Sequence, residues 1–439
     1  MEQYSFYIET YGCQMNVSDS EIVKSILLSD GMTAASLDDA NIILLNTCSV
    51  RDNAEERVLN RIDTLHHILR KRKQNAVIGV IGCMAERLKD KLFDSLNAVS
   101  IVVGPDEYKK LPELARNALE GHNGLAIELS MEETYSDIIP ARNSDMFAWV
   151  SIMRGCNNFC SYCVVPYTRG RERSRTVESI LKEINLLKEE NFKEVTLLGQ
   201  NVNSYNDNGV RFPDLLRKIA EIIPEMRIRF VTSHPRDMSD ALIETIAQYD
   251  NICNYIHLPL QSGSNRILKD MNRRYTVEHF FELIDKIRRL IPHCALSTDV
   301  IAGYPIETLE DHQATLDAMK HVRFDSAFMF KYSPREGTRA AKMNDEVPEE
   351  EKIRRLNEII EQQNQISREK NEEEIGRIFE ILVEAPSKKN VLEWAGRTDT
   401  NKLVIFNNKE KKYKQGDLIK IKVIRSTGAT LFGEVINNN

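Results

Sequence analysis

The segment Arg154-Gly155-Cys156-Asn157-Asn158-Phe159-Cys160-Ser161-Tyr162-Cys163 carries three cysteines in the pattern C-x3-C-x2-C. It follows the apolar run Phe147–Met153, which is typical of a buried strand. Three thiolates at this spacing can surround one small metal centre. A cluster of four irons and four sulfides usually takes four thiolates, so three leave one iron open to another ligand. Structural zinc is the alternative, but its sites need a fourth Cys or His, and none lies close in the sequence.

The chain around this segment, residues 147–374, alternates short apolar runs with amphipathic stretches. Repeated β-α order predicts a parallel sheet, and six such units predict an open, incomplete relative of the eightfold β/α barrel. Active sites of such barrels lie at the carboxyl ends of the strands. A polar, charge-rich helix is expected over residues 349–374. The predicted strands are Phe147–Met153, Glu194–Gly199, Arg227–Thr232, Tyr255–Pro259, Ala295–Ile301 and Ala327–Lys331.

Residues 1–125 show the same alternation, so we expect a separate N-terminal α/β domain with a parallel sheet. Its predicted strands are Tyr4–Thr10, Asn41–Asn46, Ala76–Ile81 and Val99–Val103. Its predicted helices are Ser18–Ser29, Asn53–Arg70, Glu86–Leu96 and Asp106–Leu119. Residues 126–146 have no clear period and are expected to form a linker.

Three further cysteines, Cys13, Cys48 and Cys83, follow three of these N-terminal strands at equal intervals of 35 residues. Points just after parallel strands share the carboxyl edge of the sheet, where ligands bind. The spacing therefore favours a second metal cluster with an open iron, and three buried core cysteines are the alternative. Cys253 and Cys294 have no such context and are expected in the core.

Residues 375–439 read as a small β-barrel. Five short strands are expected, separated by turn signals such as Gln415-Gly416-Asp417. This tail carries 12 Lys and Arg against 7 Asp and Glu, although the whole chain has a net charge of −7. A basic module suits nucleic-acid binding, and a merely solvated surface is the alternative. The predicted strands are Ile375–Glu384, Val391–Arg397, Lys402–Phe406, Leu418–Val423 and Leu431–Val435.

The composition fits a globular protein of several domains. Among 439 residues, 42% are hydrophobic and 28% charged, and no apolar run approaches the roughly 20 residues that a membrane-spanning helix needs. The first residues show no signal-peptide pattern, so we expect a cytoplasmic protein without a membrane partner. Eight cysteines in such a chain are expected as metal ligands or core residues rather than as disulfides.

The C-x3-C-x2-C loop after the first strand of a six-unit β/α domain resembles the radical S-adenosylmethionine (SAM) superfamily. The rest of the chain resembles the methylthiotransferase family through the stretches 10–16 (TYGCQMN), 46–48 (NTC) and 82–85 (GCMA). The tail resembles a TRAM domain, an RNA-binding β-barrel of tRNA-modifying enzymes. Within the family, residues 163–170, 198–205 and 258–264 are most similar to the MiaB branch. Ile306, Glu336 and Arg339 depart from the usual pattern, which leaves two loop shapes open.

This resemblance implies an enzyme that inserts a methylthio group at C2 of N6-dimethylallyladenosine, at position 37 of tRNA. It implies two 4Fe–4S clusters, one on Cys156, Cys160 and Cys163 and one on Cys13, Cys48 and Cys83. The first would bind SAM and yield a 5′-deoxyadenosyl radical, and the second would hold sulfur, so that two SAM are used per product. Implied partners are the tRNA anticodon stem-loop, an electron donor such as flavodoxin or ferredoxin, and a sulfur donor. We expect a monomer.

Further site residues are expected from their positions. The carboxyl ends of the barrel strands offer polar side chains for SAM, and Arg274 could pair its carboxylate. These candidates are Gln200, Asn201, Ser233, His234, Gln261, Arg274 and Asp299. His257 is expected to be a core histidine.

Candidate RNA contacts are the alternating arginines beside the cysteine loop and basic residues of the tail, with a solvated surface as the alternative. These candidates are Arg169, Arg171, Arg173, Arg175, Lys388, Lys389, Arg397, Lys402, Lys411 and Lys412. In the tail, Phe379, Trp394 and Phe406 could stack on bases but are more typical of a barrel core.

Three other functions stay open on the sequence alone. A sister branch of the family acts on N6-threonylcarbamoyladenosine of tRNA. An iron–sulfur or sulfur-carrier protein with an RNA-binding tail would need no radical turnover. A zinc-dependent RNA-binding module would use the same cysteines as zinc ligands.

Overall fold

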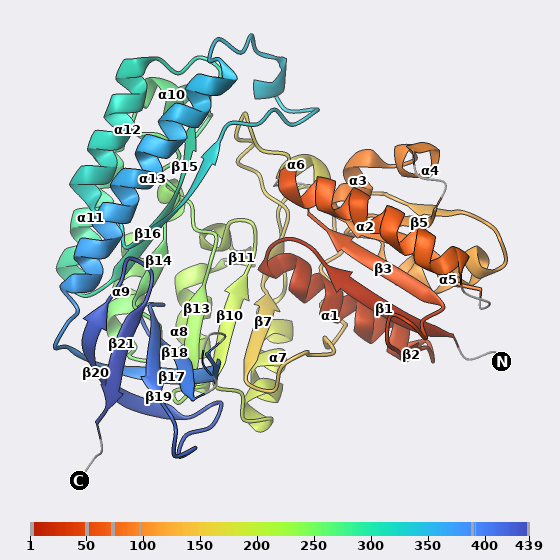
Figure 1. Ribbon diagram of the computed structural model, residues 1–439, viewed down its shortest axis with the longest axis horizontal. Coiled ribbons are helices and arrows are strands. Elements are labelled where there is room, and N and C mark those ends of the chain that lie inside the picture. The colour runs from red at the N-terminus through yellow and green to blue at the C-terminus, as the bar shows by residue number, and fades with distance from the viewer. Residues whose placement is uncertain are drawn as a thin grey trace.

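The computed structural model describes residues 4–48, 52–71, 75–95, 98–387, 390 and 392–436. In this part of the chain an α/β unit, an open β/α barrel and a closed β-barrel follow one another (Figure 1). The mixed α/β architecture predicted from the sequence is confirmed. None of the described helices combines the length and the apolar character needed to cross a membrane.

The N-terminal sheet is built on β3 (Ile42–Thr47) and β4 (Val77–Gly82), which are buried along their whole length. Such strands are typical of parallel sheets with helices on both faces. The described strands run in the order β2-β1-β3-β4-β5-β6, and every neighbouring pair is parallel. The other strands are β1 (Ser5–Thr10), β2 (Thr33–Ala34), β5 (Val99–Val103) and β6 (Gly124–Ala126). The sequence did not predict β2 and β6, which have too few residues to show a period.

Helices cover both faces of this sheet. One face packs against α1 (Gln14–Ser29) and α5 (Leu111–Leu119), which follows the 3-10 helix η1 (Tyr108–Lys110). The other packs against α2 (Asp52–Arg70), α3 (Cys83–Leu88) and α4 (Lys91–Ser95). The prediction of one helix over Glu86–Leu96 is wrong, because the chain turns at Lys89, whose φ of +54° is left-handed.

The central unit contains the six predicted strands. They form two three-stranded parallel sheets, β13-β10-β7 and β14-β15-β16, which a bridge between Ile228 and Ile252 links into an open barrel. The strands are β7 (Phe147–Ser151), β10 (Glu194–Leu198), β13 (Arg227–Phe230), β14 (Tyr255–His257), β15 (Ala295–Ala302) and β16 (Ser326–Lys331). Strand β7 is shorter than expected, since its predicted end pairs separately as β8 (Met153–Arg154) with β9 (Arg173–Ser174).

The helices of this unit start where the sequence provides a cap. Thr176, Ser239, Ser264, Thr276 and Thr308 each accept a hydrogen bond from a backbone N–H of the first turn. The helices are α6 (Val165–Thr168), α7 (Val177–Glu189), α8 (Phe212–Ile222), α9 (Asp240–Gln248), α10 (Asn265–Asp270), α11 (Val277–Leu290), α12 (Leu309–Val322) and α13 (Glu349–Glu372). Shorter elements are η2 (Val202–Ser204), η3 (Pro235–Asp237), η4 (Ala340–Lys342), β11 (Asn206–Asp207) and β12 (Val210–Arg211).

The tail forms the predicted five-stranded barrel, closed in the order β17-β18-β19-β21-β20. Phe379 and Phe406 are buried in its core and Trp394 packs against them, so these aromatic rings serve mainly as core. Because β18 starts after a turn, its bounds differ from the prediction. The strands are β17 (Ile378–Pro386), β18 (Glu393–Thr398), β19 (Leu403–Asn407), β20 (Leu418–Ser426) and β21 (Leu431–Val435).

Two arginines of β13 hold the tail barrel in place. Arg227 donates to the carbonyls of Arg397 and Glu380, and Arg229 donates to those of Asp399 and Thr398, all at 2.8–2.9 Å. Arg227 is the first residue of β13, so the tail barrel lies at the amino ends of these strands (Figure 1). The carboxyl ends, where the cysteine loop begins, therefore stay free of the tail barrel.

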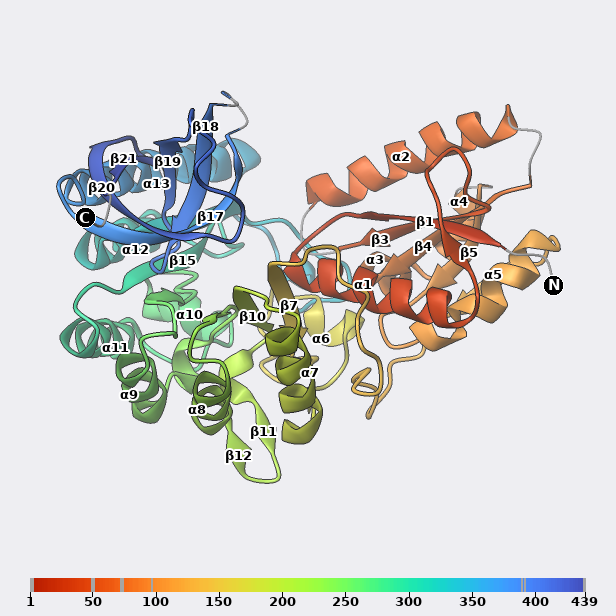
Figure 2. The same ribbon diagram turned by 90° about the horizontal axis from the view of Figure 1, so that it is seen from below.

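The N-terminal unit joins the central unit through buried ion pairs. Helix α1 lies beside β7 (Figure 2), and its residue Asp19 accepts hydrogen bonds from Arg154 at 2.6 and 3.0 Å and from Arg169 at 2.7 Å. Asp106 accepts two further bonds from Arg173 at 2.8 and 3.0 Å. Both carboxylates are almost fully buried. Residues 127–146 form no helix or strand and run past this interface.

Removal of the Asp19 charge should loosen the interface. In Asp19→Asn two buried guanidinium groups lose their shared counter-ion, and breaking a buried ion pair typically costs about 3–5 kcal/mol. We expect a clearly lower midpoint of urea unfolding. Asp214→Asn, which breaks the exposed pair with Arg217, is the control and should change stability by less than about 1 kcal/mol. Equal effects of the two substitutions would contradict this assignment.

Candidate active site

The cysteine loop begins directly after β8 and is shaped by a glycine. Gly155 has a φ of +77°, and a Cβ there would lie 2.0 Å from the Arg171 carbonyl oxygen. Only glycine therefore lets the loop lie against residues 170 and 171, where the Cys156 N–H donates to the Gly170 carbonyl at 3.2 Å. The Cys163 N–H donates to the Cys160 carbonyl at 3.0 Å. The loop thus places the three predicted cysteines at the carboxyl end of the barrel.

Burial keeps the thiols of Cys156 and Cys163 protonated unless a positive centre lies beside them. Burial raises the pKa of Cys156 to about 11 and that of Cys163 to about 12. Arg273, itself buried, donates from Nη1 to Cys160 Sγ at 3.4 Å. A metal cluster would supply the positive charge that deprotonates coordinating thiols. Cys156 and Cys163 would therefore be thiolates at neutral pH only with such a cluster bound.

Four of the predicted SAM contacts carry buried polar atoms without a partner among the described residues. Gln200 and Asn201 follow β10, and Ser233 and His234 follow β13. The unpartnered atoms are Gln200 Oε1, Asn201 Oδ1, Ser233 Oγ and His234 Nε2. Buried polar atoms are normally hydrogen-bonded, so this cluster of exceptions fits a polar ligand at the strand ends.

His234 is held neutral in this environment. Burial, reinforced by the charge of Arg273, lowers its pKa to about 2. Its Nδ1 accepts a hydrogen bond from the Arg236 N–H at 3.2 Å, so Nε2 carries the hydrogen. The His234 ring also lies edge-on to Tyr275, at 5.7 Å between centroids. His234 therefore offers one fixed N–H donor beside the cysteine loop.

The remaining predicted SAM contacts lie on the other half of the barrel. Gln261 follows β14, and its N–H donates to the Asp299 carbonyl of β15 at 2.8 Å. Asp299 also pairs with His257 at 3.4 Å, and His257 contacts Ser297, so this histidine has partners as expected. Arg274 is exposed, whereas its neighbour Arg273 contacts the cysteine loop. The role of Arg273 could not be predicted from the sequence, because two adjacent arginines give no sign of which one points inward.

The N-terminal cysteines also gather at one sheet edge. Cys13 caps α1 after β1, Cys48 follows β3, and Cys83 opens α3 after β4. The strand order 2-1-3-4-5 has its switch point between β1 and β3, where ligands bind in such sheets. Gly12 has a φ of +141°, and a Cβ there would lie 2.5 Å from Cys48 Cβ. Glycine is thus required for the close approach of the Cys13 and Cys48 loops.

Two buried asparagines hold these loops. Asn16 donates to Asn46 Oδ1 at 3.0 Å and to the Thr47 carbonyl at 3.1 Å, and Asn46 donates back to the Asn16 carbonyl at 2.8 Å. Cys13 Sγ lies 3.3 Å from Asn16 Oδ1. The stretches 10–16 and 46–48 that resemble the methylthiotransferase family contain both residues, so their structural role could have been suspected.

Cys13 and Cys83 differ in acidity. A hydrogen bond with Cys48, helped by the charge of Arg169, lowers the pKa of Cys13 to about 6. Burial raises the pKa of Cys83, although Arg169 opposes this effect. Arg169 Nε donates to Cys83 Sγ at 3.2 Å. One arginine from the central unit therefore contacts the N-terminal cysteine site.

Three of the arginines predicted to contact RNA are internal. Arg169, Arg173 and Arg175 are buried and bind Asp19, Asp106 and Glu183, respectively. The prediction of phosphate contacts does not fit these three, because their guanidinium groups are paired inside the protein. Arg171 is exposed and lies over the Phe159 ring at 4.4 Å, so it remains a candidate.

The predicted RNA contacts of the tail divide in the same way. Lys402 is paired with Asp325 at 3.2 Å and with Glu374 at 2.9 Å. All three side chains are largely buried, so the predicted contact with RNA does not fit Lys402. Arg397 is half-buried and pairs with Glu384. Lys411 and Lys412 are exposed. Lys388 and Lys389 lie outside the described residues.

The residues that depart from the family pattern make local contacts. The Ile306 carbonyl accepts from Arg266 at 2.6 Å. Glu336 pairs with Lys91 of α4 at 3.6 Å, and Arg339 with Asp270 at 2.9 Å. The loop of residues 336–339 is thus held by ion pairs of its substituted side chains, whereas Ile306 contributes a backbone contact.

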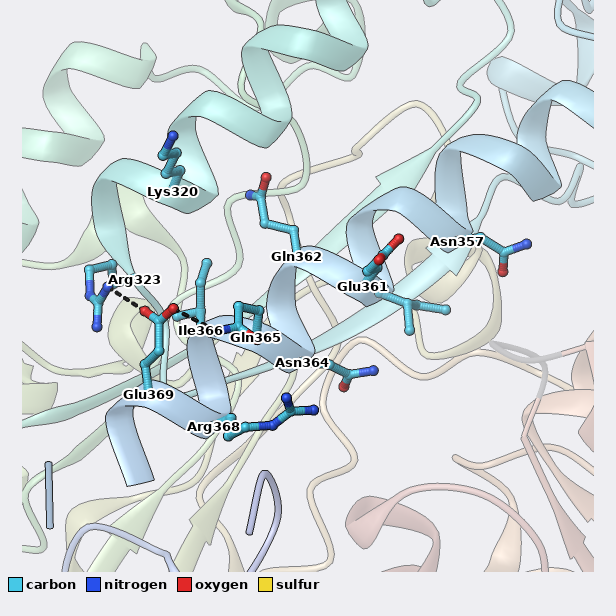
Figure 3. Close-up of a pocket in the computed structure, with 11 residues that line it drawn as sticks. Lys320, Arg323, Asn357, Glu361, Gln362, Asn364, Gln365, Ile366, Arg368 and Glu369 are labelled. Atoms are coloured by element: carbon cyan, nitrogen blue, oxygen red, sulfur yellow. Dashed lines mark hydrogen bonds and ion pairs between the residues drawn. The ribbon is translucent and has the colours of Figure 1, made fainter. Parts of the chain in front are cut away.

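Two grooves lie away from both cysteine sites. One of about 860 Å³ lies along α13 and the end of α12 and is lined by polar residues such as Arg323 and Glu369 (Figure 3). Another of about 1240 Å³ separates α8 and β13 from the tail barrel. Neither contains a predicted site residue.

In the described residues no three His, Cys, Asp or Glu side chains are placed to hold a single metal ion. Cys253 and Cys294 are buried, as expected.

The sequence matches three family descriptions. Residues 5–104 match the uncharacterized protein family UPF0004, residues 150–319 the radical SAM superfamily, and residues 372–436 the TRAM domain. Proteins of Phocaeicola vulgatus and Porphyromonas gingivalis are 51% and 52% identical, each over 99% of this chain and 96% of its own length. Both carry the name tRNA-2-methylthio-N(6)-dimethylallyladenosine synthase.

Solved structures with the same fold are more distant in sequence. The radical SAM methyltransferase TsrM from Kitasatospora setae has a TM-score of 0.57 at 14% identity and covers 77% of each chain. The cobalamin-dependent radical SAM enzyme OxsB has a TM-score of 0.55 at 14% identity, over 82% of this chain and 56% of its own. At such identity the likeness shows the fold alone.

The acidity of Cys13 can be tested in the metal-free protein. Cys13 is exposed, and its thiolate predominates above its pKa of about 6. Its rate of alkylation by iodoacetamide should therefore be half-maximal near pH 6, because the thiolate is the reactive form. Cys156, whose pKa is raised, should stay unreactive at neutral pH. Mass spectrometry of peptides measures both rates. A Cys13 rate that rises only near the ordinary thiol pKa of about 8.5 would contradict the described geometry.

Proposed function

The chain belongs to the family of tRNA-2-methylthio-N(6)-dimethylallyladenosine synthases, and from this premise we propose how its two cysteine sites divide the reaction. The enzyme inserts a methylthio group at C2 of N6-dimethylallyladenosine, at position 37 of tRNA, and uses two SAM per product. The observation that carries the assignment of roles is the contact of Arg169 with Cys83. It places the segment after the C-x3-C-x2-C loop against the N-terminal cysteines.

Cys156, Cys160 and Cys163 would hold the 4Fe–4S cluster of the radical SAM site. With this cluster and SAM bound, the site supplies a carbon-centred radical that can take hydrogen from an unactivated C–H bond, and SAM also supplies the methyl group. Arg273 orients the loop through Cys160. The unpartnered side-chain atoms after β10 and β13 would bind the polar groups of SAM, with His234 as a donor. Gln261, Asp299 and Arg274 remain candidates on the other half of the barrel.

Cys13, Cys48 and Cys83 would hold a second 4Fe–4S cluster, which would carry the sulfur to be transferred. This assignment is supported by their gathering at the switch point of the N-terminal sheet. It is also supported by the Asn16–Asn46 network, which fixes two of the three loops.

The substrate adenine would lie against the inner face of β14, β15 and β16. His257 is paired in register with Ser297, two residues before Asp299 on β15, and Asp299 is paired with Phe328, so His257, Asp299 and Phe328 share this face. Phe328 and Phe330 are exposed there, although large aromatic side chains are normally covered. They offer a surface for a purine ring with an apolar dimethylallyl substituent, since bases taken out of a stack pack on aromatic rings.

The remaining partners follow from the substrate and the chemistry. The anticodon stem-loop would contact the tail barrel through exposed basic residues, which include Lys411, Lys412, Lys420 and Lys422. A one-electron donor such as flavodoxin or ferredoxin and a separate sulfur donor are needed for repeated turnover. We place the enzyme in the cytoplasm, with its tRNA substrate, and expect a monomer.

The activity can be tested by nucleoside mass spectrometry of tRNA. The gene is expressed in cells that lack their own methylthiotransferase. Methylthio-dimethylallyladenosine should appear with the unaltered protein and be absent with Cys13→Ala or Cys156→Ala, because each change removes a cluster ligand. Cys253→Ala, a buried cysteine outside both sites, is the control and should keep the product. A methylthio-threonylcarbamoyl product instead would assign the chain to the sister substrate.

The number of clusters can be counted directly. The protein reconstituted without oxygen should bind about eight irons, and about four after replacement of either set of three cysteines by alanine, since each 4Fe–4S cluster holds four irons. Iron analysis and Mössbauer spectroscopy measure this content. About four irons in the unaltered protein, lost completely on replacement of Cys156, Cys160 and Cys163, would refute the second cluster.

A further inference from the structure

Arg169 belongs to the radical SAM segment but acts in the N-terminal site. It ends the short helix α6, six residues after Cys163, and only 4% of its surface is exposed. Its Nε donates to Cys83 Sγ at 3.2 Å, and its Nη2 donates to Asp19 Oδ2 at 2.7 Å. Its Nη1 is buried without a partner among the described residues. The guanidinium group is therefore fixed on two sides and retains an unused donor.

Arg169 belongs to a buried cluster of charged side chains. Asp19 is shared with Arg154, and Asp106 binds Arg173 and lies 3.8 Å from Arg154. Two buried carboxylates thus bind three buried guanidinium groups, and Glu86, a third buried carboxylate, lies near Asp106. Of these arginines, Arg169 is the one that contacts a cysteine of the N-terminal site. In a buried site such a charge acts with little screening by water.

We propose that Arg169 is a positioning residue that fixes Cys83 as a cluster ligand and strengthens the binding of an anionic sulfur species at the N-terminal cysteine site. This inference rests on the proposed function, in which that site holds sulfur. The ligand class is a sulfide or an alkyl thiolate. Charge-assisted hydrogen bonds are about twice as strong as neutral ones, so a fixed guanidinium group beside the cluster favours an anion over water.

The position of Arg169 also joins the two sites. The same ten-residue stretch that carries Cys160 and Cys163 ends at Arg169. Asp19, on α1 of the N-terminal unit, orients the guanidinium group toward Cys83. The sulfur site is therefore complete only when the two units are docked.

Thiolate binding to the N-terminal cluster tests this proposal. The full chain with Cys156, Cys160 and Cys163 replaced by alanine serves as parent, so that one cluster gives the signal. Methanethiolate is titrated into the reconstituted parent after dithionite has reduced the cluster to its paramagnetic one-electron-reduced form, and the change in the electron paramagnetic resonance of the cluster gives the dissociation constant. We expect Arg169→Gln to weaken binding by at least about tenfold. Arg171→Gln, the exposed neighbour in the same segment, is the control and should stay within about twofold of the parent.

A second variant, Arg169→Lys, is measured in case Arg169→Gln does not retain the iron of its cluster. Arg169→Lys keeps the charge but cannot donate to Cys83 and Asp19 together, so binding should weaken by at least about threefold. Affinity equal to that of the parent in whichever variant retains its iron would overturn the role of Arg169. If the parent itself bound no four-iron cluster, the proposed function would fail, and this inference with it. Unchanged affinity in variants with full iron would remove only the inference.

Discussion

A buried carboxylate shared by two arginines fixes the N-terminal unit of this enzyme against the central barrel. Asp19 is fully buried on α1, and it binds Arg154 at the start of the cysteine loop and Arg169, six residues after the last cysteine of that loop. A carboxylate in this position is stable only if both cations stay in place, because an uncompensated buried charge is costly. The N-terminal unit therefore cannot rotate freely on the barrel. The relative position of the two cysteine sites depends on this constraint.

The two sites follow one structural rule applied twice. Each set of cysteines lies at the carboxyl edge of a parallel sheet, and each needs a glycine where backbone and side chain approach closely. Gly12 lets the Cys13 and Cys48 loops meet, and Gly155 lets the cysteine loop pack on residues 170 and 171. The tail barrel docks at the opposite, amino ends of the strands through Arg227 and Arg229. An RNA bound to the tail barrel must therefore extend along the molecule to reach the cysteines.

Much of this arrangement could be predicted from the sequence. The apolar runs predicted where the strands lie along the chain, since parallel strands buried on both faces leave a plain pattern, and the equal spacing of Cys13, Cys48 and Cys83 indicated one sheet edge. The order of the strands within each sheet was not predicted. The pairing of charges could not be predicted. The alternation of Arg169, Arg171, Arg173 and Arg175 suggests a phosphate-binding surface, but the buried partners Asp19, Asp106 and Glu183 are distant or unremarkable in sequence. The same limit applies to Arg273 and to Lys402, whose partners are set by tertiary packing.

The claim that two cysteine sites on separate units serve one adenine can be tested most directly by a crystal structure of the reconstituted enzyme with an anticodon stem-loop, obtained without oxygen. We expect both clusters to face the same adenine and Arg169 to stay within hydrogen-bond distance of Cys83 and Asp19. Clusters that open toward different surfaces, with Arg169 separated from Cys83, would contradict this claim.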